Sequence, residues 1–210
     1  MPEVEGARGV RARPTPDTGE RLTGHDLWDE SARPTAPPVP AGRTYSEAGQ
    51  QVAGLLVDVH GMLRAELGAL RDVLIRVETG EASAADARGV VSALTMRRHD
   101  WSVGAYCARY CRVVTEHHTI ESAWVFPHLA GSDTGLVPVV ERLQAEHEVI
   151  HGVIEGVDRA LVAYQLDESA LPGVRGAVDL LADLLLSHLS YEEAQLLEPL
   201  ARFGFAPGQV

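Results

Sequence analysis

The chain has 210 residues, and 45% of them are hydrophobic, which is enough for one sizeable core or at most two small ones. It contains 18 arginines and no lysine, so Schiff-base chemistry and the phosphate-binding lysine of P-loop proteins are excluded. A formal net charge of −12 argues against a nucleic-acid partner, which would need a basic face. With two cysteines, no secretion signal and no membrane-spanning stretch, we expect a cytoplasmic protein without a membrane partner.

The first 44 residues differ in composition from the rest of the chain. They hold seven of the 12 prolines, and their six arginines nearly balance seven acidic residues. Such a segment buries too little apolar surface to offset its ordering entropy. We therefore expect a disordered Pro/Arg-rich arm over residues 1–44, able to carry a protein partner, then a helical domain over 45–204 and a short tail over 205–210.

From Ser46 onward, apolar residues recur at intervals of three and four, which predicts amphipathic α-helices. Strand patterns are absent. The fold class is therefore all-α: an up-down four-helix bundle with an extra helical segment between the first and second long helices. Pro127 is expected to loosen or kink the end of the second long helix. The long helices are predicted over residues 46–79, 101–129, 134–164 and 172–203, and the extra segment over about 83–96.

The nine histidines indicate a site inside this bundle. His60 lies on the first long helix, and each of the other three carries two polar residues four positions apart. This spacing places both side chains on one helix face, one turn apart. The three pairs are His117 with Glu121, His147 with His151, and His188 with Glu192.

The depth of these pairs in an antiparallel bundle supports a common site. Glu121 lies about 12 residues before the second loop and His147 about 14 after it, which is roughly the same height. His151 lies about 18 residues before the third loop and His188 about 19 after it. Five histidines and two carboxylates are too many for structural zinc and suit two carboxylate-bridged metals, with iron as the cellular candidate. The alternative is that they are hydrogen-bonded polar groups on solvated faces.

Four strings in this order resemble the helices of a hemerythrin-like, HHE cation-binding domain: VHGMLRAEL (59–67), EHHTIESAWVFPHL (116–129), LQAEHEVIHGVI (143–154) and SHLSYEEAQLLEPL (187–200). The resemblance covers about residues 46–203. It implies a non-haem di-iron centre, with an oxo or hydroxo group as third bridge and one open iron position for dioxygen. By position it implies one iron on His147, His151 and His188, a second on His60 and His117, and bridging Glu121 and Glu192.

The sequence departs from the oxygen-carrier pattern, in which an Asp lies five residues after the last histidine. Positions 192 and 193 are both Glu; Glu192 is favoured as the bridge and Glu193 stays open. Candidates to support the site or its chemistry are Tyr110, His118 and Tyr191, and the expected wall of the oxygen pocket is Leu184, Leu185 and Leu189. Cys107 and Cys111 are interpreted as core filler rather than a redox dithiol.

Three functions are compatible with these residues. The first is binding of dioxygen, nitric oxide or peroxide for sensing, storage or detoxification. The second is a di-iron oxidase or peroxidase that acts on a small molecule. The third is a metal-stabilised interaction module, in which the proline-rich arm recruits a protein. Removal of residues 1–44 is expected to spare an oxygen site and to abolish partner recruitment.

Overall fold

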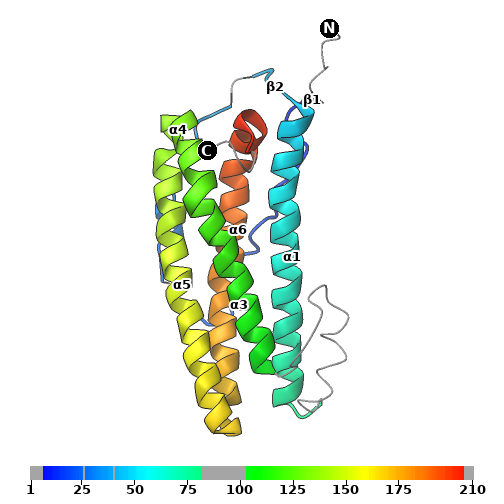
Figure 1. The fold of residues 1–210 in the computed structure, drawn as a ribbon, viewed down its shortest axis with the longest axis vertical. Helices are drawn as coiled ribbons and strands as arrows, with labels where there is room; N and C mark the ends of the chain where they lie inside the picture. Colours follow the sequence, from blue (N-terminus) through cyan, green and yellow to red (C-terminus); the bar gives the residue numbers. More distant parts are fainter. Residues whose placement is uncertain (1–6, 26, 40, 82–102, 206–210) are drawn as a thin grey trace.

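The computed structural model describes residues 7–25, 27–39, 41–81 and 103–205. Four long helical segments run alternately up and down side by side, which confirms the predicted all-α, up-down four-helix bundle (Figure 1). The predicted segment 83–96 lies outside the described residues. The four segments are α1 (Glu47–Glu78), the run of α3 (Val103–Ile120), η2 (Glu121–Val125) and α4 (Phe126–Ser132), α5 (Val137–Leu166), and α6 (Leu171–Phe203).

The helix ends follow from local chemistry. The Ser46 side chain caps α1 by accepting a hydrogen bond of 3.1 Å from the backbone N–H of Gly49. At the other end of the chain, α6 stops at Gly204, whose φ of 68° favours glycine. The 3-10 turns η3 (Thr134–Leu136) and η4 (Glu168–Ala170) begin the short connections into α5 and α6.

The predicted irregularity near Pro127 takes the form of a π-helical turn. In η2, the N–H of Phe126 bonds the carbonyl of Glu121, five residues back instead of four. Proline lacks an N–H and crowds the preceding turn, so the regular bonding pattern is already interrupted there. The wider turn lies next to the polar residues of the bundle interior.

The apolar core is divided into two clusters by a polar layer. One cluster contains Leu63, Ile150 and Leu185, and the other contains Phe126 and Leu200. Between them lie buried histidines and carboxylates contributed by all four long segments. Burial of such groups is costly unless they find partners, so the layer needs a chemical explanation.

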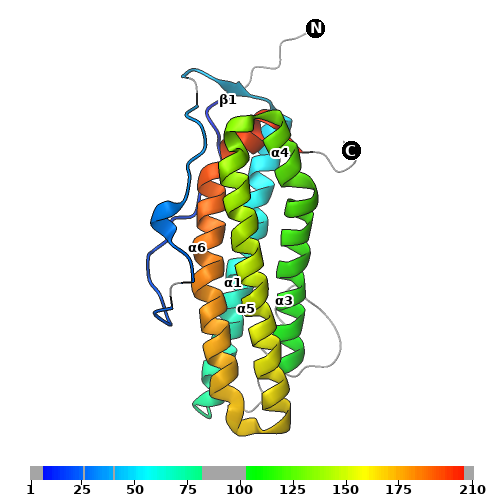
Figure 2. The same ribbon diagram turned by 90° about the vertical axis from the view of Figure 1, so that its left-hand side faces the viewer.

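The N-terminal segment lies against the bundle. We call residues 7–39, without residue 26, the strap; it runs alongside α6 (Figure 2). Its first strand, β1 (Ala7–Arg8), pairs antiparallel with β2 (Thr44–Tyr45). The backbone N–H groups of Leu22 and Thr23 donate to Asp183 on α6 at 2.7 and 2.9 Å.

This placement differs from the disordered arm expected from composition. Polar contacts hold the strap where apolar burial alone would not, and many of them are made by its backbone groups. For example, the N–H of Ala36 donates to Gln195 at 2.8 Å, and the Tyr191 hydroxyl donates to the carbonyl of Pro34 at 2.8 Å. Within the described residues, none of the helices has the length and apolar character needed to cross a membrane.

Candidate metal centre

Seven side chains of the polar layer bring their ligand atoms together in two groups. The atoms of each group lie within 4.8 Å of one another. The first group is drawn from all of the long segments except α5, and the second from α3, α5 and α6. The first group consists of His60, His117, Glu121 and Glu192, and the second of His118, His147 and His188.

Each group contains a close pair of imidazole nitrogens. The Nε2 atoms of His60 and His117 are 3.1 Å apart, and those of His147 and His188 are also 3.1 Å apart. Two nitrogens that each lie about 2.1 Å from one ion, at right angles, are separated by about 3 Å. The spacing of both pairs therefore fits a shared metal ion.

The two carboxylates lie between the groups. Glu121 places Oε1 at 3.2 Å from Nε2 of His117 and Oε2 at 3.6 Å from Nε2 of His147. Glu192 places Oε2 at 3.6 Å from Nε2 of both His60 and His188. Each carboxylate thus faces imidazoles of both groups, which is the position of a bridging ligand.

These carboxylates are also buried, and their oxygens lack hydrogen bonds within the described part of the chain. Glu121 is 3% exposed and Glu192 is 0% exposed, and none of their four oxygens has a hydrogen-bond partner among the described residues. Burial raises the pKa of both carboxyl groups above the ordinary value. A buried acceptor without a partner is strongly unfavourable, and a pair of cations between the carboxylates would satisfy all four oxygens. The donor set therefore fits a two-metal centre.

The buried histidines differ from one another in pKa, and the difference runs within the first group as well as between the groups. Burial disfavours the charged imidazole of His60, but the carboxylates of Glu121 and Glu193 outweigh it and raise its pKa to about 9. Burial lowers the pKa of His147 to about 2 and that of His117 to about 4. A metal requires neutral imidazoles and ionised carboxylates, so binding at this site would release protons.

Two further carboxylates lie behind the histidines. Oε1 of Glu193 is 2.9 Å from Nδ1 of His60, and Oε2 of Glu146 is 3.1 Å from Nδ1 of His188. An ionised carboxylate only accepts, so Nδ1 carries the hydrogen and Nε2 is left to face the ligand cluster. Burial opposes ionisation, but hydrogen bonds, chiefly from His188 and His60 respectively, lower the pKa of Glu146 and of Glu193 to about 2.

Most of the residues selected from sequence meet in this layer, but His151 does not. Its side chain is 55% exposed, and a carboxylate oxygen of Glu155 lies 3.7 Å from its Nε2. His118 occupies the third place beside His147 instead, with ring centroids 3.9 Å apart and planes 11° from parallel. Consecutive residues project about 100° apart on a helix, so His117 and His118 face the two groups from one element.

The Glu192 and Glu193 alternatives occupy different places. Glu192 is the carboxylate within the cluster, whereas Glu193 lies behind His60. The sequence did not predict that Glu146 lies behind a histidine of the site. Its position next to His147 in the chain was the only feature that pointed to it. Because a residue beside a ligand projects away from it on the helix, that signal would not have predicted contact with His188.

The remaining candidates have structural contacts. Tyr110 is fully buried and donates to the carbonyl of Leu63 at 3.1 Å, and Tyr191 donates to the strap. Among the described residues, Cys107 and Cys111 are free and buried, and burial raises the pKa of Cys107 to about 12. The expected pocket wall belongs to one apolar cluster: Leu184, Leu185 and Leu189.

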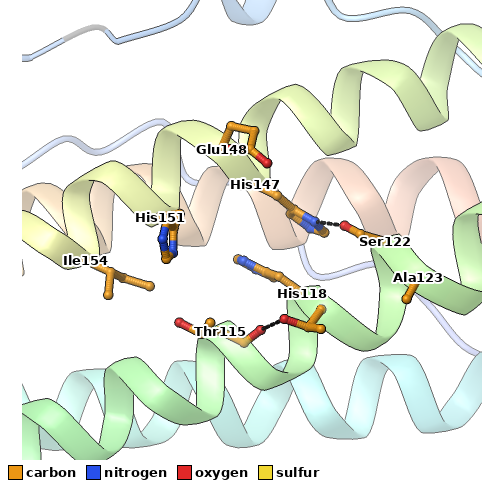
Figure 3. Close-up of a pocket in the computed structure, with 9 residues that line it drawn as sticks. Thr115, His118, Ser122, Ala123, His147, Glu148, His151 and Ile154 are labelled. Carbon is orange, nitrogen blue, oxygen red and sulfur yellow. Dashed lines mark hydrogen bonds between the residues drawn. The ribbon is translucent and has the colours of Figure 1, made fainter.

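A pocket of about 510 Å³ opens between α3 and α5 beside the second group (Figure 3). Its lining includes His118, His147 and His151, together with Thr115 and Glu148. Ser122 also lines the pocket, and its hydroxyl oxygen lies 2.9 Å from Nδ1 of His147. Solvent therefore reaches the layer from the side of the second group.

A four-helix bundle that gathers histidines and carboxylates from facing helices belongs to the metal-binding bundles as a class. The model of the hemerythrin HHE cation-binding domain matches residues 52–200, which is more than half of the chain. The chain therefore belongs to the hemerythrin HHE cation-binding family. Neither a curated protein nor a solved structure matches it significantly.

Proposed function

We propose that the chain holds two iron ions and uses them to bind a small ligand such as dioxygen, nitric oxide or peroxide, for sensing, storage or detoxification. One observation carries the proposal: Glu121 and Glu192, buried and without a hydrogen bond among the described residues, lie between two groups of histidines. Two positive ions would balance both carboxylates. When bound, a di-iron pair supplies the electrons for reversible binding or reduction of dioxygen.

The distances favour a specific assignment of ligands. His60 and His117 would hold one ion, and Glu121 and Glu192 would bridge to the other. For the second ion, His118 joins His147 and His188 in place of the His151 that the family resemblance implies. The first ion would then have fewer imidazoles than the second and more room for a small ligand.

The chain's own residues prepare this site in three ways. Glu193 and Glu146 hold the Nδ1 protons of His60 and His188, which fixes the orientation of both rings. The two apolar clusters cover the layer from both ends of the bundle and exclude water from those directions. The pocket between α3 and α5 provides the route for a small ligand.

The proposal is tested by loading the full chain with iron, counting the metal, reducing it without oxygen and then admitting oxygen. We expect two irons per chain and a visible absorption band that depends on both iron and oxygen. A band that disappears on removal of oxygen would establish reversible binding. One metal per chain, or no oxygen-dependent band, would contradict the proposal.

The pocket favours a second candidate function, oxidation of a small polar molecule. Its volume of about 510 Å³ exceeds what a diatomic ligand needs, and its lining offers the hydroxyl groups of Thr115 and Ser122. Under this alternative, the oxygen-dependent band would decay rapidly and oxygen would be consumed in proportion to an added substrate.

A further inference from the structure

The strap reaches the two carboxylates that lie behind the histidines. On one side, Nε and Nη2 of Arg33 donate to the two oxygens of Glu146 at 2.8 and 3.0 Å. On the other, the backbone N–H of Thr15 donates to Oε2 of Glu193 at 2.6 Å. Both carboxylates are buried, with 1% and 0% of the respective residues exposed. Each group of histidines is thus connected to the strap through one carboxylate.

Arg33 is held firmly in this position. Its side chain is only 10% exposed, and its Nη1 donates to the hydroxyl of Ser187 at 2.9 Å. The guanidinium also lies over the rings of Tyr191 and Trp28, at 4.7 and 5.6 Å from their centroids. A bidentate, stacked and buried arginine is preorganised to fix the orientation of a carboxylate.

Thr15 has an equivalent position on the other side. Glu193 also accepts a hydrogen bond of 2.6 Å from Nη1 of Arg64 on α1, so the strap and the bundle share this carboxylate. Thr15 stands between Pro14 and Pro16, which cannot donate, and its N–H is therefore the local donor. The carboxylate in turn faces Nδ1 of His60.

We propose that the strap is a working part of the metal centre, in which Arg33 positions His188 through Glu146 and the backbone of Thr15 positions His60 through Glu193. The inference rests on the proposed function for the presence of a metal, but not on iron or on dioxygen. The strap precedes residues 52–200, so this support comes from outside the segment that defines the family. The two anchors act on different histidine groups.

The physical effect of each anchor is on the orientation and basicity of an imidazole. A carboxylate that accepts the Nδ1 proton makes Nε2 a better ligand, and it does so only while it is itself held in place. Loss of such an outer partner typically lowers metal affinity about 10- to 100-fold. Loss of Arg33 leaves Glu146 with Arg142, whose Nε lies at 2.7 Å, so the carboxylate stays ionised but loses its bidentate partner.

The test uses the full chain and the Co²⁺ ion, whose visible absorption reports both affinity and ligand geometry. We expect Arg33→Ala to weaken one of two Co²⁺ binding steps about 10-fold or more and to change its absorption spectrum. Arg33→Lys should restore part of the affinity. The matched control is Arg11→Ala, because Arg11 is a strap arginine whose side chain pairs with the exposed Glu47.

A second pair of variants keeps the test independent of how well Arg33→Ala folds. Thr15→Pro removes the N–H that reaches Glu193, whereas Thr15→Ala keeps it. We expect Thr15→Pro to weaken the other binding step and Thr15→Ala to leave both steps unchanged. Normal Co²⁺ binding by Arg33→Ala and by Thr15→Pro would overturn the inference.

The outcomes separate this inference from the proposed function. A wild-type chain that binds Co²⁺ and shows the variant effects, but gives no oxygen-dependent band with iron, would refute the proposed function and support the strap. A chain that responds to oxygen but is insensitive to both anchors would refute the strap alone. A wild-type chain that binds no metal would overturn both.

Discussion

The two histidine groups resemble each other in their support and differ in their surroundings. Each contains a histidine whose Nδ1 faces a buried carboxylate, Glu193 in one and Glu146 in the other. However, the open pocket is lined by residues of the second group and by none of the first. The first group has two imidazoles and the second has three. The pocket therefore lies on the side of the group that has three imidazoles.

This asymmetry concerns the side from which a small molecule can reach the histidine groups. We expect a small molecule that enters this pocket to meet His118 and His147 first. Substitutions that affect the two groups together or separately can test this comparison.

The largest effect is expected from a substitution that removes a carboxylate shared by the two histidine groups. Glu192→Gln eliminates the charge of a carboxylate that lies between them, so we expect affinity for the metal pair to fall by more than about 100-fold, beyond the loss of an outer hydrogen-bond partner. Glu193→Gln keeps an acceptor for Arg64 and should cost less. Isothermal titration of both variants decides between the carboxylates. A greater loss in Glu193→Gln would show that the bridge is misassigned.

The next largest effect is expected from a substitution of a histidine that belongs to the second group alone. His118→Ala should remove one metal ion and lower affinity about 10- to 100-fold or more at the second group. The matched variant His151→Ala alters an exposed side chain on the same pocket and should leave metal content unchanged. Metal analysis of the purified variants measures the difference. If His151→Ala lost the ion and His118→Ala kept it, His151 rather than His118 would be the third imidazole of the second group.

A substitution in α1 should disturb the packing of this helix against α6. A Cβ added at Gly49 would clash with the carbonyl oxygen of Ala201 on α6, whereas one added at Gly54 meets nothing within 4 Å. We expect Gly49→Ala to destabilise the chain by about 1–3 kcal/mol, and Gly54→Ala to be neutral or stabilising by less than about 1 kcal/mol. Thermal unfolding of the two variants provides the test; equal stability would argue against the close approach of α1 and α6.

The smallest expected effect is on the pH dependence of the metal-free chain. The pKa of His60 is raised from 6.5 to about 9, so its stabilising contribution is complete below pH 6.5 and is lost as pH rises to about 9. The pKa of His147 is lowered, so stability at the second group is lost as pH falls below 6.5. His60→Gln should abolish the alkaline loss of a few degrees in Tm. Persistence of that loss would show that another group causes it.

Much of the bundle could be predicted because its signals are local. Ser46 as a cap, the stop at Gly204 and the irregularity before Pro127 each depend on a few neighbouring residues and were expected from them. The depth argument for Glu121 and His147 also agreed with the structure, in which their side chains approach to 3.6 Å. In an antiparallel bundle, height follows directly from residue count.

The docking of the strap and the place of His118 within a ligand group were not predicted, for two different reasons. The strap is held by contacts up to 178 residues apart in sequence, such as Thr15 with Glu193, and composition contains no information on such pairs. His118 was expected to support the site, not to join a ligand group, because a spacing of four selects one face of a helix, whereas the bundle interior accepts two adjacent faces of α3. The expectation that removal of residues 1–44 spares the site took no account of the contacts between the strap and the bundle. Because Arg33 contacts Glu146, we now expect this removal to weaken metal binding.

The sequence by itself determined the all-α bundle, the level at which its polar residues meet and the family to which the chain belongs, because helix periodicity and motif order are properties of the linear chain. Only the tertiary structure decided which imidazoles lie together in each group, that Glu192 lies between them and Glu193 behind His60, and that the proline-rich segment contacts Glu146 and Glu193. The physical reason is that rotation of a helix about its axis, and the docking of an irregular segment, are set by contacts with other elements rather than by local propensity.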